Sequence, residues 1–193
     1  MFNINIFFYK NDFELVFKLI FVKMQKAYEI CLEMIQQRNY KVLDRDDERI
    51  LAMKPDNTQM CVFVTNATKF NVESIQEHIS MMSKMNLNHS IIVYKDNATP
   101  VAKKIIDESQ DLVIELFHVD DLQYNLTKHY LVPLHELYAK KGTVKNSEFK
   151  KKYGDKIPIL LKTDPVSRFY GYQKGDIIKI TRKNDYVTFR IVK

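Results

Sequence analysis

The sequence predicts two units: an α/β unit with a mostly parallel sheet and helices on both of its faces, followed by a small α+β unit. Short apolar runs at residues 60–64, 90–94 and 112–117 are typical of buried strands. Segments of helical periodicity separate these runs, and alternation of strands and helices implies right-handed crossovers and parallel pairing. The third observation is a change of composition after residue 143, where the chain becomes strongly basic.

The first 23 residues show no clean period, and we expect residues 1–23 to form an extension ahead of the α/β unit. A better helical pattern begins at Met24 with "MQKAYEICLEMIQQRN". Its apolar residues recur on one face: Ala27, Ile30, Cys31, Met34 and Ile35. We therefore place the α/β unit at residues 24–125 and treat Met24 as a candidate start of the chain.

Two later helices of the α/β unit carry start signals. After a charged stretch at 44–49 and the first apolar run, Asn71 stands at an N-cap position before a helical pattern of apolar residues. Thr99 and Pro100 place a capping oxygen and then a proline at the first turn of "VAKKIIDES". Both helices fall between predicted strands, as an α/β unit requires.

The second unit is expected at residues 126–193. "LVPLHEL" (131–137) is predicted to be a connector, because Pro133 disfavours both helix continuation and ladder pairing. The remaining pattern predicts a short basic helix, ended by Gly154, and three strands, of which the last two form an antiparallel hairpin. The expected ranges are 145–153 for the helix and 157–162, 176–181 and 186–192 for the strands.

The net charge of +6 is unevenly distributed. Residues 144–193 hold 13 Lys/Arg against 5 Asp/Glu, whereas the first 143 residues hold 17 against 19. This asymmetry predicts an acidic partner for the second unit, either nucleic acid or a protein surface. An ordinary solvated basic face explains the charge equally well.

No catalytic, metal or cofactor site is expected. The five histidines form no cluster at ligand spacing, and the glycines at 171 and 175 lack the spacing of a phosphate-binding loop. A nuclease-like acid set would have to join Asp56 to the triplet 148–150, which lies in the other unit. We therefore expect the chain to have no active site of its own.

Two further classes are disfavoured. No stretch is apolar for the eighteen or so residues that a membrane-spanning helix needs, since Glu14 and Lys18 interrupt the most apolar one. Cys31 and Cys61 lie in apolar runs, which favours packed thiols over a disulfide and hence a reducing compartment.

Three segments resemble the fifth subunit shared by the three eukaryotic nuclear RNA polymerases, a family whose C-terminal half has a counterpart among the small subunits of archaeal RNA polymerase. The most specific is "IPILLKTDPVSRFYGYQKGDIIKI", continued by "YVTFRIV". The others are "ELFHVDDLQYNLTKHYLVPLHELY" and "IIVYKDNATPVAKK", with a looser match at "EMIQQRNYKV". The resemblance covers essentially residues 24–193. The many Lys, Asn and Ile residues and the four glycines indicate an AT-rich genome. Together with the divergence of the sequence from the family pattern, this is consistent with a large DNA virus as the source.

This resemblance implies a non-catalytic subunit of a multisubunit DNA-directed RNA polymerase. The C-terminal unit would be the assembly domain, which docks on the largest subunit beside neighbouring small subunits. The residues implied at that interface are Pro133, His135, Asp164, Pro165, Arg168, Phe169, Tyr170, Gly171, Gly175 and Arg190. Aromatic and arginine side chains dominate interface energies, but Phe169 and Tyr170 fit the core of this small unit equally well. For Arg168 we favour an ion pair, within the unit or with the partner.

The N-terminal unit would be the jaw domain, which lies beside downstream duplex DNA in this family. The implied DNA-proximal residues are Asn97, Thr99, Pro100, Lys103 and Lys104. A helix N-terminus and lysines attract phosphate without reading sequence, so the free chain should bind DNA weakly. The alternative is an ordinary cap with solvated lysines. The net positive charge of residues 144–193 would instead place the DNA contact in the second unit. We follow the resemblance, because its motifs are more specific than a count of charges.

The chain also departs from the family pattern. Asn39 stands where the family usually has glycine, Ile159 replaces a commonly basic residue, and the loop before Tyr186 is shorter than in the family. Two other functions stay open, a free-standing basic DNA-binding transcription factor and a degenerate nuclease-like enzyme. We expect an intracellular protein that is not a homo-oligomer, in the nucleus if cellular, or in host cytoplasm and virion if viral.

Overall fold

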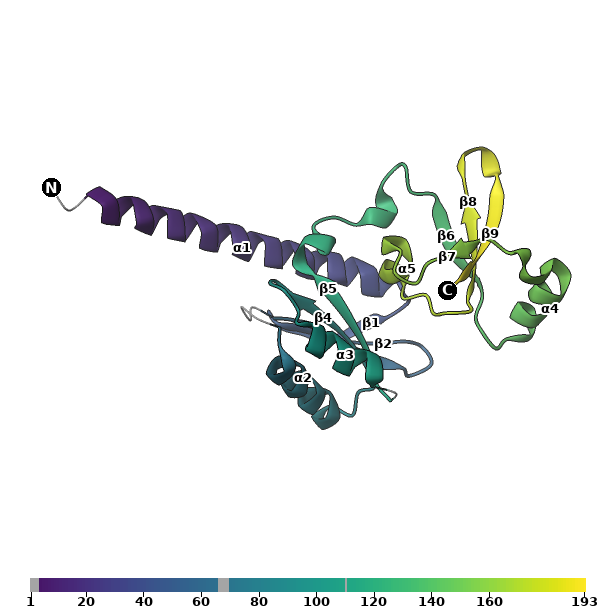
Figure 1. The fold of residues 1–193 in the computed structure, drawn as a ribbon, viewed down its shortest axis with the longest axis horizontal. Helices are drawn as coiled ribbons and strands as arrows, with labels where there is room; N and C mark the ends of the chain where they lie inside the picture. The colour runs from purple at the N-terminus through teal and green to yellow at the C-terminus, as the bar shows by residue number, and fades with distance from the viewer. Residues whose placement is uncertain (1–3, 66–69, 110) are drawn as a thin grey trace. The chain divides into compact units, whose positions relative to one another are not determined.

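The computed structural model describes residues 4–65, 70–109 and 111–193 (Figure 1). The chain divides into two compact units, the first ending at Tyr124 and the second running from Asn125 to Lys193. Each contains one mixed β-sheet with helices. No helix within the described part of the chain is both long and apolar enough to cross a lipid bilayer.

The first unit begins with α1 (Ile4–Gln37), one continuous helix. The predicted apolar face from Ala27 to Ile35 is confirmed, since all five of its residues are buried. The helix begins at Ile4, twenty residues before the helical pattern that the sequence shows from Met24; residues 1–3 lie outside the described residues. Residues 4–23 contain no glycine or proline to break a helix, and their apolar residues follow no clean helical period in the sequence, so the amphipathic signal is missing.

The sheet of the first unit has five strands in the order β1-β2-β3-β4-β5. Their bounds are β1 Lys41–Arg45, β2 Arg49–Met53, β3 Gln59–Val64, β4 His89–Tyr94 and β5 Val113–His118. The three predicted buried runs are β3, β4 and β5, and they pair in parallel as expected. The strands β1, β2 and β3 pair antiparallel, so the prediction of a mostly parallel sheet is wrong.

The missed strands β1 and β2 form a hairpin around the charged stretch. Asp46 closes its turn, because Oδ1 accepts hydrogen bonds from the backbone N–H groups of Glu48 (3.0 Å) and Arg49 (2.9 Å). Since most of β1 is exposed, its sequence lacks the apolar run that marks a buried strand.

Helices α2 (Val72–Lys84) and α3 (Pro100–Glu108) connect the parallel strands. Both predicted caps are confirmed: the side chain of Asn71 accepts from the N–H of Ser74 (3.0 Å), and that of Thr99 accepts from the N–H of Ala102 (3.3 Å). The two helices share one hydrophobic cluster with alternate residues of β3 and β4, while α1 packs against β3 and the short 3₁₀ helix η1 (Val119–Leu122) (Figure 1).

The second unit has a four-stranded sheet in the order β6-β8-β9-β7. The strands are β6 Leu134–Ala139, β7 Ile159–Leu160, β8 Ile177–Thr181 and β9 Val187–Val192. The helices are α4 Val144–Tyr153 and α5 Pro165–Tyr170, with 3₁₀ helices η2 Leu126–Lys128, η3 Gly154–Lys156 and η4 Lys183–Asp185. The predicted β8–β9 hairpin and the basic helix that ends at Gly154 are confirmed.

Two predictions in this unit are wrong. Residues 134–137, expected to be a connector, belong to β6, because Pro133 lies just before the strand and removes no ladder hydrogen bond. The strand expected at 157–162 is only two residues long. The sheet separates two small cores, one beside α4 around Phe149 and Ile177, and one beside the turn after α5 around Tyr172 and Ile178.

Candidate functional site

The implied interface of the second unit centres on α5, which is capped at both ends. Oδ1 of Asp164 accepts from the N–H groups of Val166 (2.9 Å) and Ser167 (3.4 Å). Pro165 occupies the first turn, where a missing N–H costs nothing. Gly171 ends the helix in the left-handed conformation, φ 69°, which favours glycine. The local sequence therefore fixes the backbone of this six-residue helix without help from a partner.

The three large side chains of α5 differ in exposure. Phe169 is buried, with 1% of its surface exposed. Tyr170 is half-buried and stacks on Tyr172, with ring centroids 5.2 Å apart. Arg168 is also half-buried and already has contacts within the chain. Arg168 and Tyr170 thus keep surface that a partner could cover, whereas Phe169 mainly positions the helix.

The bend at Gly175 is supported by buried polar groups that the sequence did not single out. Gly175 has φ 95°, and a Cβ there would lie 3.0 Å from side-chain carbons of Lys141. Asp176 is buried and accepts from the backbone N–H groups of Lys141 (2.9 Å) and Gln173 (2.8 Å). Asn146 donates to the Gly175 carbonyl (3.0 Å). In the sequence, these supporting groups are marked only by Asp176, which stands between Gly175 and a predicted apolar strand.

His135 lies on β6 and Arg190 on β9, and Pro133 directly precedes β6. The buried His135 ring donates from Nδ1 to the Pro133 carbonyl (2.7 Å), and burial lowers its pKa. The Arg190 guanidinium donates to the Ile159 carbonyl (3.3 Å). The strand register places His135 opposite Ile180, and Arg190 opposite Ile178, so both side chains share one face of the sheet.

The implied DNA-proximal residues gather at the start of α3 in the first unit. Asn97 and Pro100 are exposed, and the Thr99 side chain caps the helix. Lys103 is exposed, and Lys104 lies 3.6 Å from Glu108 in an exposed pair one turn along. Thr99 therefore acts as a normal N-cap of α3, while the N-terminus of this helix and both lysines are exposed to solvent.

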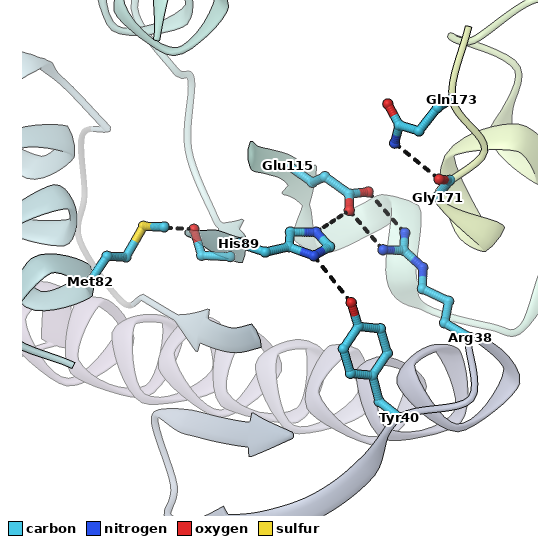
Figure 2. Close-up of polar contacts among 8 residues, drawn as sticks. Arg38, Tyr40, Met82, His89, Glu115, Gly171 and Gln173 are labelled. Atoms are coloured by element: carbon cyan, nitrogen blue, oxygen red, sulfur yellow. Dashed lines mark hydrogen bonds and ion pairs between the residues drawn. The ribbon is translucent and has the colours of Figure 1, made fainter. Parts of the chain in front are cut away.

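A partly buried polar network joins the residues directly after α1 to the sheet of the first unit (Figure 2). The Arg38 guanidinium makes a two-pronged contact with Glu115 on β5, with N–O distances of 2.7 and 2.9 Å. His89 on β4 lies between Glu115 (2.8 Å from Nε2) and the Tyr40 hydroxyl (3.2 Å from Nδ1). Burial acts to raise the pKa of Glu115, but Arg38 and His89 outweigh it and hold the pKa at about 2. Sequence analysis missed this network, because its members are far apart in the chain.

Both cysteines are buried and not in a disulfide, as the sequence predicted. Burial raises the pKa of the Cys31 and Cys61 thiols to about 12, so neither is a reactive thiolate at neutral pH. Within the part of the chain that the structure describes, no group of three His, Cys, Asp or Glu side chains could hold a metal ion.

Comparison with known proteins finds RNA polymerase subunits, as the resemblance in the sequence implied. The family model "RNA polymerase Rpb5, C-terminal domain" matches residues 124–192. The "Putative DNA-directed RNA polymerase subunit 454R" of Invertebrate iridescent virus 6 is 33% identical over 184 residues, covering 87% of this chain and 98% of the relative. The chain belongs to the Rpb5 family of RNA polymerase subunits.

Cellular members of the Rpb5 family also align with most of this chain. The "DNA-directed RNA polymerases I, II, and III subunit rpabc1" of Dictyostelium discoideum is 29% identical over 190 residues, covering 88% of this chain and 96% of that protein. RPABC1 of Caenorhabditis briggsae is 31% identical over 155 residues, covering 77% of this chain and 74% of that protein. The Rpb5 C-terminal match contains all ten implied interface residues, while the five implied DNA-proximal residues precede it.

One departure from the Rpb5 pattern has a structural explanation. Asn39, which the resemblance sets against a usual glycine, follows α1 with φ 63°. Asparagine tolerates this left-handed conformation better than other residues with a Cβ. The backbone bend that glycine would provide is therefore kept.

Proposed function

We propose that this chain is a structural, non-catalytic subunit of a multisubunit DNA-directed RNA polymerase. The observation that supports this most directly is the match to the viral subunit along 98% of its length. The relatives carry the names of polymerase subunits, and the described residues offer no metal-binding group. The chain then acts through its surfaces, which join subunits and position duplex DNA.

In this proposal the second unit is the assembly domain and docks on the largest subunit. The capped α5 and the bend at Gly175 give that unit a fixed surface before any partner binds. Pro165 is exposed, and Arg168, Tyr170 and Arg190 are half-buried, so all four offer contact surface on or near α5 and β9. Little ordering entropy would be lost on docking, because the backbone is already held in place.

The first unit is then the jaw domain, with the start of α3 facing downstream DNA. The accessible helix end and the exposed Lys103 and Lys104 support this placement. Two lysines and a helix end provide a weak, salt-sensitive attraction for phosphate, which is sufficient when the rest of a polymerase holds the duplex. Such a subunit works where its polymerase works, in the nucleus of a cell or in the host cytoplasm and virion of a virus.

The test is recovery of the tagged full chain from its native source. We expect the large polymerase subunits to be recovered in amounts equal to the chain, and the free chain to bind duplex DNA weakly and without sequence preference. Recovery without polymerase, together with tight sequence-selective binding by the free chain, would favour the free-standing transcription factor instead. DNA cleavage by the free chain that Asp56→Ala abolishes would favour the nuclease.

A further inference from the structure

The outer edge of β9 is only partly covered by β7. Alternate residues of a strand direct their backbone N–H and C=O groups to opposite sides. Val192 donates its N–H to Asp176 at the start of β8 (2.9 Å), whereas Ile191 donates to the Pro158 carbonyl on the β7 side (2.9 Å). The polar backbone groups of Phe189 and Val187 therefore also point away from β8, toward the outer edge.

The shortness of β7 follows from Pro158. The two strands pair in parallel at Ile159 and Leu160 only. One step earlier in this parallel ladder, the nitrogen of residue 158 would face the carbonyl of Phe189, but proline has no N–H to donate. No described residue pairs with the outward backbone groups of Phe189 and Val187. The sheet thus ends with an open length of strand edge.

An apolar groove of about 360 Å³ runs beside this open edge. Phe149 and Tyr153 on α4 form one wall, and the Phe149 ring lies 4.9 Å from that of Phe189. Val187 is 39% exposed and Tyr153 is 49% exposed, so apolar surface is accessible along it. Lys156 is the charged side chain among the described lining residues.

We propose that this edge of β9 receives an extended segment of a neighbouring polymerase subunit, which adds to the sheet as a further strand. The inference rests on the proposed function and specifies part of its docking surface. The unpaired backbone groups can form hydrogen bonds with an extended chain, and the groove can bury its apolar side chains. Lys156 favours an acidic residue at the end of the segment.

The occupant is a segment of a large protein rather than a free peptide. The groove accommodates only a few residues, and a stable specific interface generally buries on the order of 1,000 Å² or more. A short segment gains useful affinity only when other contacts of the same protein hold it nearby. Docking of the second unit on a large subunit supplies those contacts.

Val187→Pro in the full chain tests the proposal, with Val187→Thr as the matched control. Proline removes the outward N–H and no ladder bond to β8, and Tyr186 has φ −70° and ψ 115°, which suits a residue before proline. Threonine keeps the N–H and a branched side chain. We expect Val187→Pro to recover about tenfold less polymerase than the wild type, and Val187→Thr to match the wild type.

Hydrogen exchange of the wild-type chain provides a second measurement that does not depend on a variant folding. The amides of Val187 and Phe189 should exchange about tenfold more slowly in the purified polymerase than in the free chain. If the wild type recovers no polymerase, the proposed function fails. If Val187→Pro recovers as much polymerase as the wild type, or the two amides stay unprotected in the complex, strand addition is wrong while the proposed function stands. Protection of these amides in a dimer of the free chain would also overturn it.

Discussion

Replacing Glu115 by glutamine removes the carboxylate that faces both Arg38 and His89 in the first unit. The pKa of Glu115 is about 2, against an ordinary value of 4.5. Each pKa unit corresponds to about 1.4 kcal/mol, so at neutral pH the folded environment stabilises the carboxylate by about 3 kcal/mol. Removing one partner of a buried ion pair costs a similar amount, about 3–5 kcal/mol, because the other charge is left uncompensated.

The pH dependence has a definite sign. Since the pKa of Glu115 is lowered in the folded chain, its contribution to stability is fully present above pH 4.5 and is lost as the pH falls toward about 2. We expect Glu115→Gln to lower the free energy of unfolding by about 3 kcal/mol at pH 7, with a much smaller loss at pH 2–3.

The measurement is urea unfolding of the full chain followed by far-ultraviolet circular dichroism at pH 7 and near pH 3. Hydrogen exchange of β4 and β5 assigns the loss to the first unit. Glu108→Gln is the control: its pair with Lys104 is exposed on both sides, so its loss should stay below about 1 kcal/mol. Equal losses for the two variants, or a loss at Glu115 that does not change with pH, would refute this account of the network.

Asn39 has φ 63°, so Asn39→Gly should leave the thermal unfolding temperature unchanged or raise it. Asn39→Val should lower the free energy of unfolding by about 1–2 kcal/mol, because a branched side chain disfavours this backbone conformation. Equal unfolding temperatures of the two variants would contradict this explanation. Asp164→Ala removes the cap of α5 and should cost about 1 kcal/mol, measured by denaturant unfolding, with Asp164→Asn close to the wild type. In the assembled polymerase, Lys103→Ala combined with Lys104→Ala should weaken DNA binding equally for all sequences and lower the slope of log affinity against log salt by up to about two. An unchanged salt slope would remove α3 from the DNA-facing surface.

The parts of the fold that the sequence predicted are those with strong local signals. The runs that become β3, β4 and β5 are largely apolar, with Glu115 as the charged residue of the third, and Asn71 and Thr99 mark helix starts by their own side-chain chemistry. Such features depend on a few neighbouring residues, so no knowledge of the tertiary structure is needed to find them.

The parts that it did not predict depend on distant contacts or on mixed local signals. The strand β1 mixes charged and apolar residues without a strand period, β2 is a short apolar run directly after the charged stretch, and β6 follows a proline that suggested a connector. The ion pair between Arg38 and Glu115 spans 77 positions of sequence and becomes visible only when α1 and β5 are placed. At the implied interface, spacing alone could not distinguish the buried Phe169 from the half-buried Tyr170.

Pro158 links the stability of the second unit to its capacity for assembly. An alanine at this position would supply the N–H that proline lacks, allow β7 to lengthen by one residue and strengthen the isolated unit by about 1 kcal/mol. The same change would occupy the carbonyl of Phe189. Under the proposed strand addition, a change that strengthens the isolated unit would therefore also remove one backbone acceptor from the edge that receives the added strand.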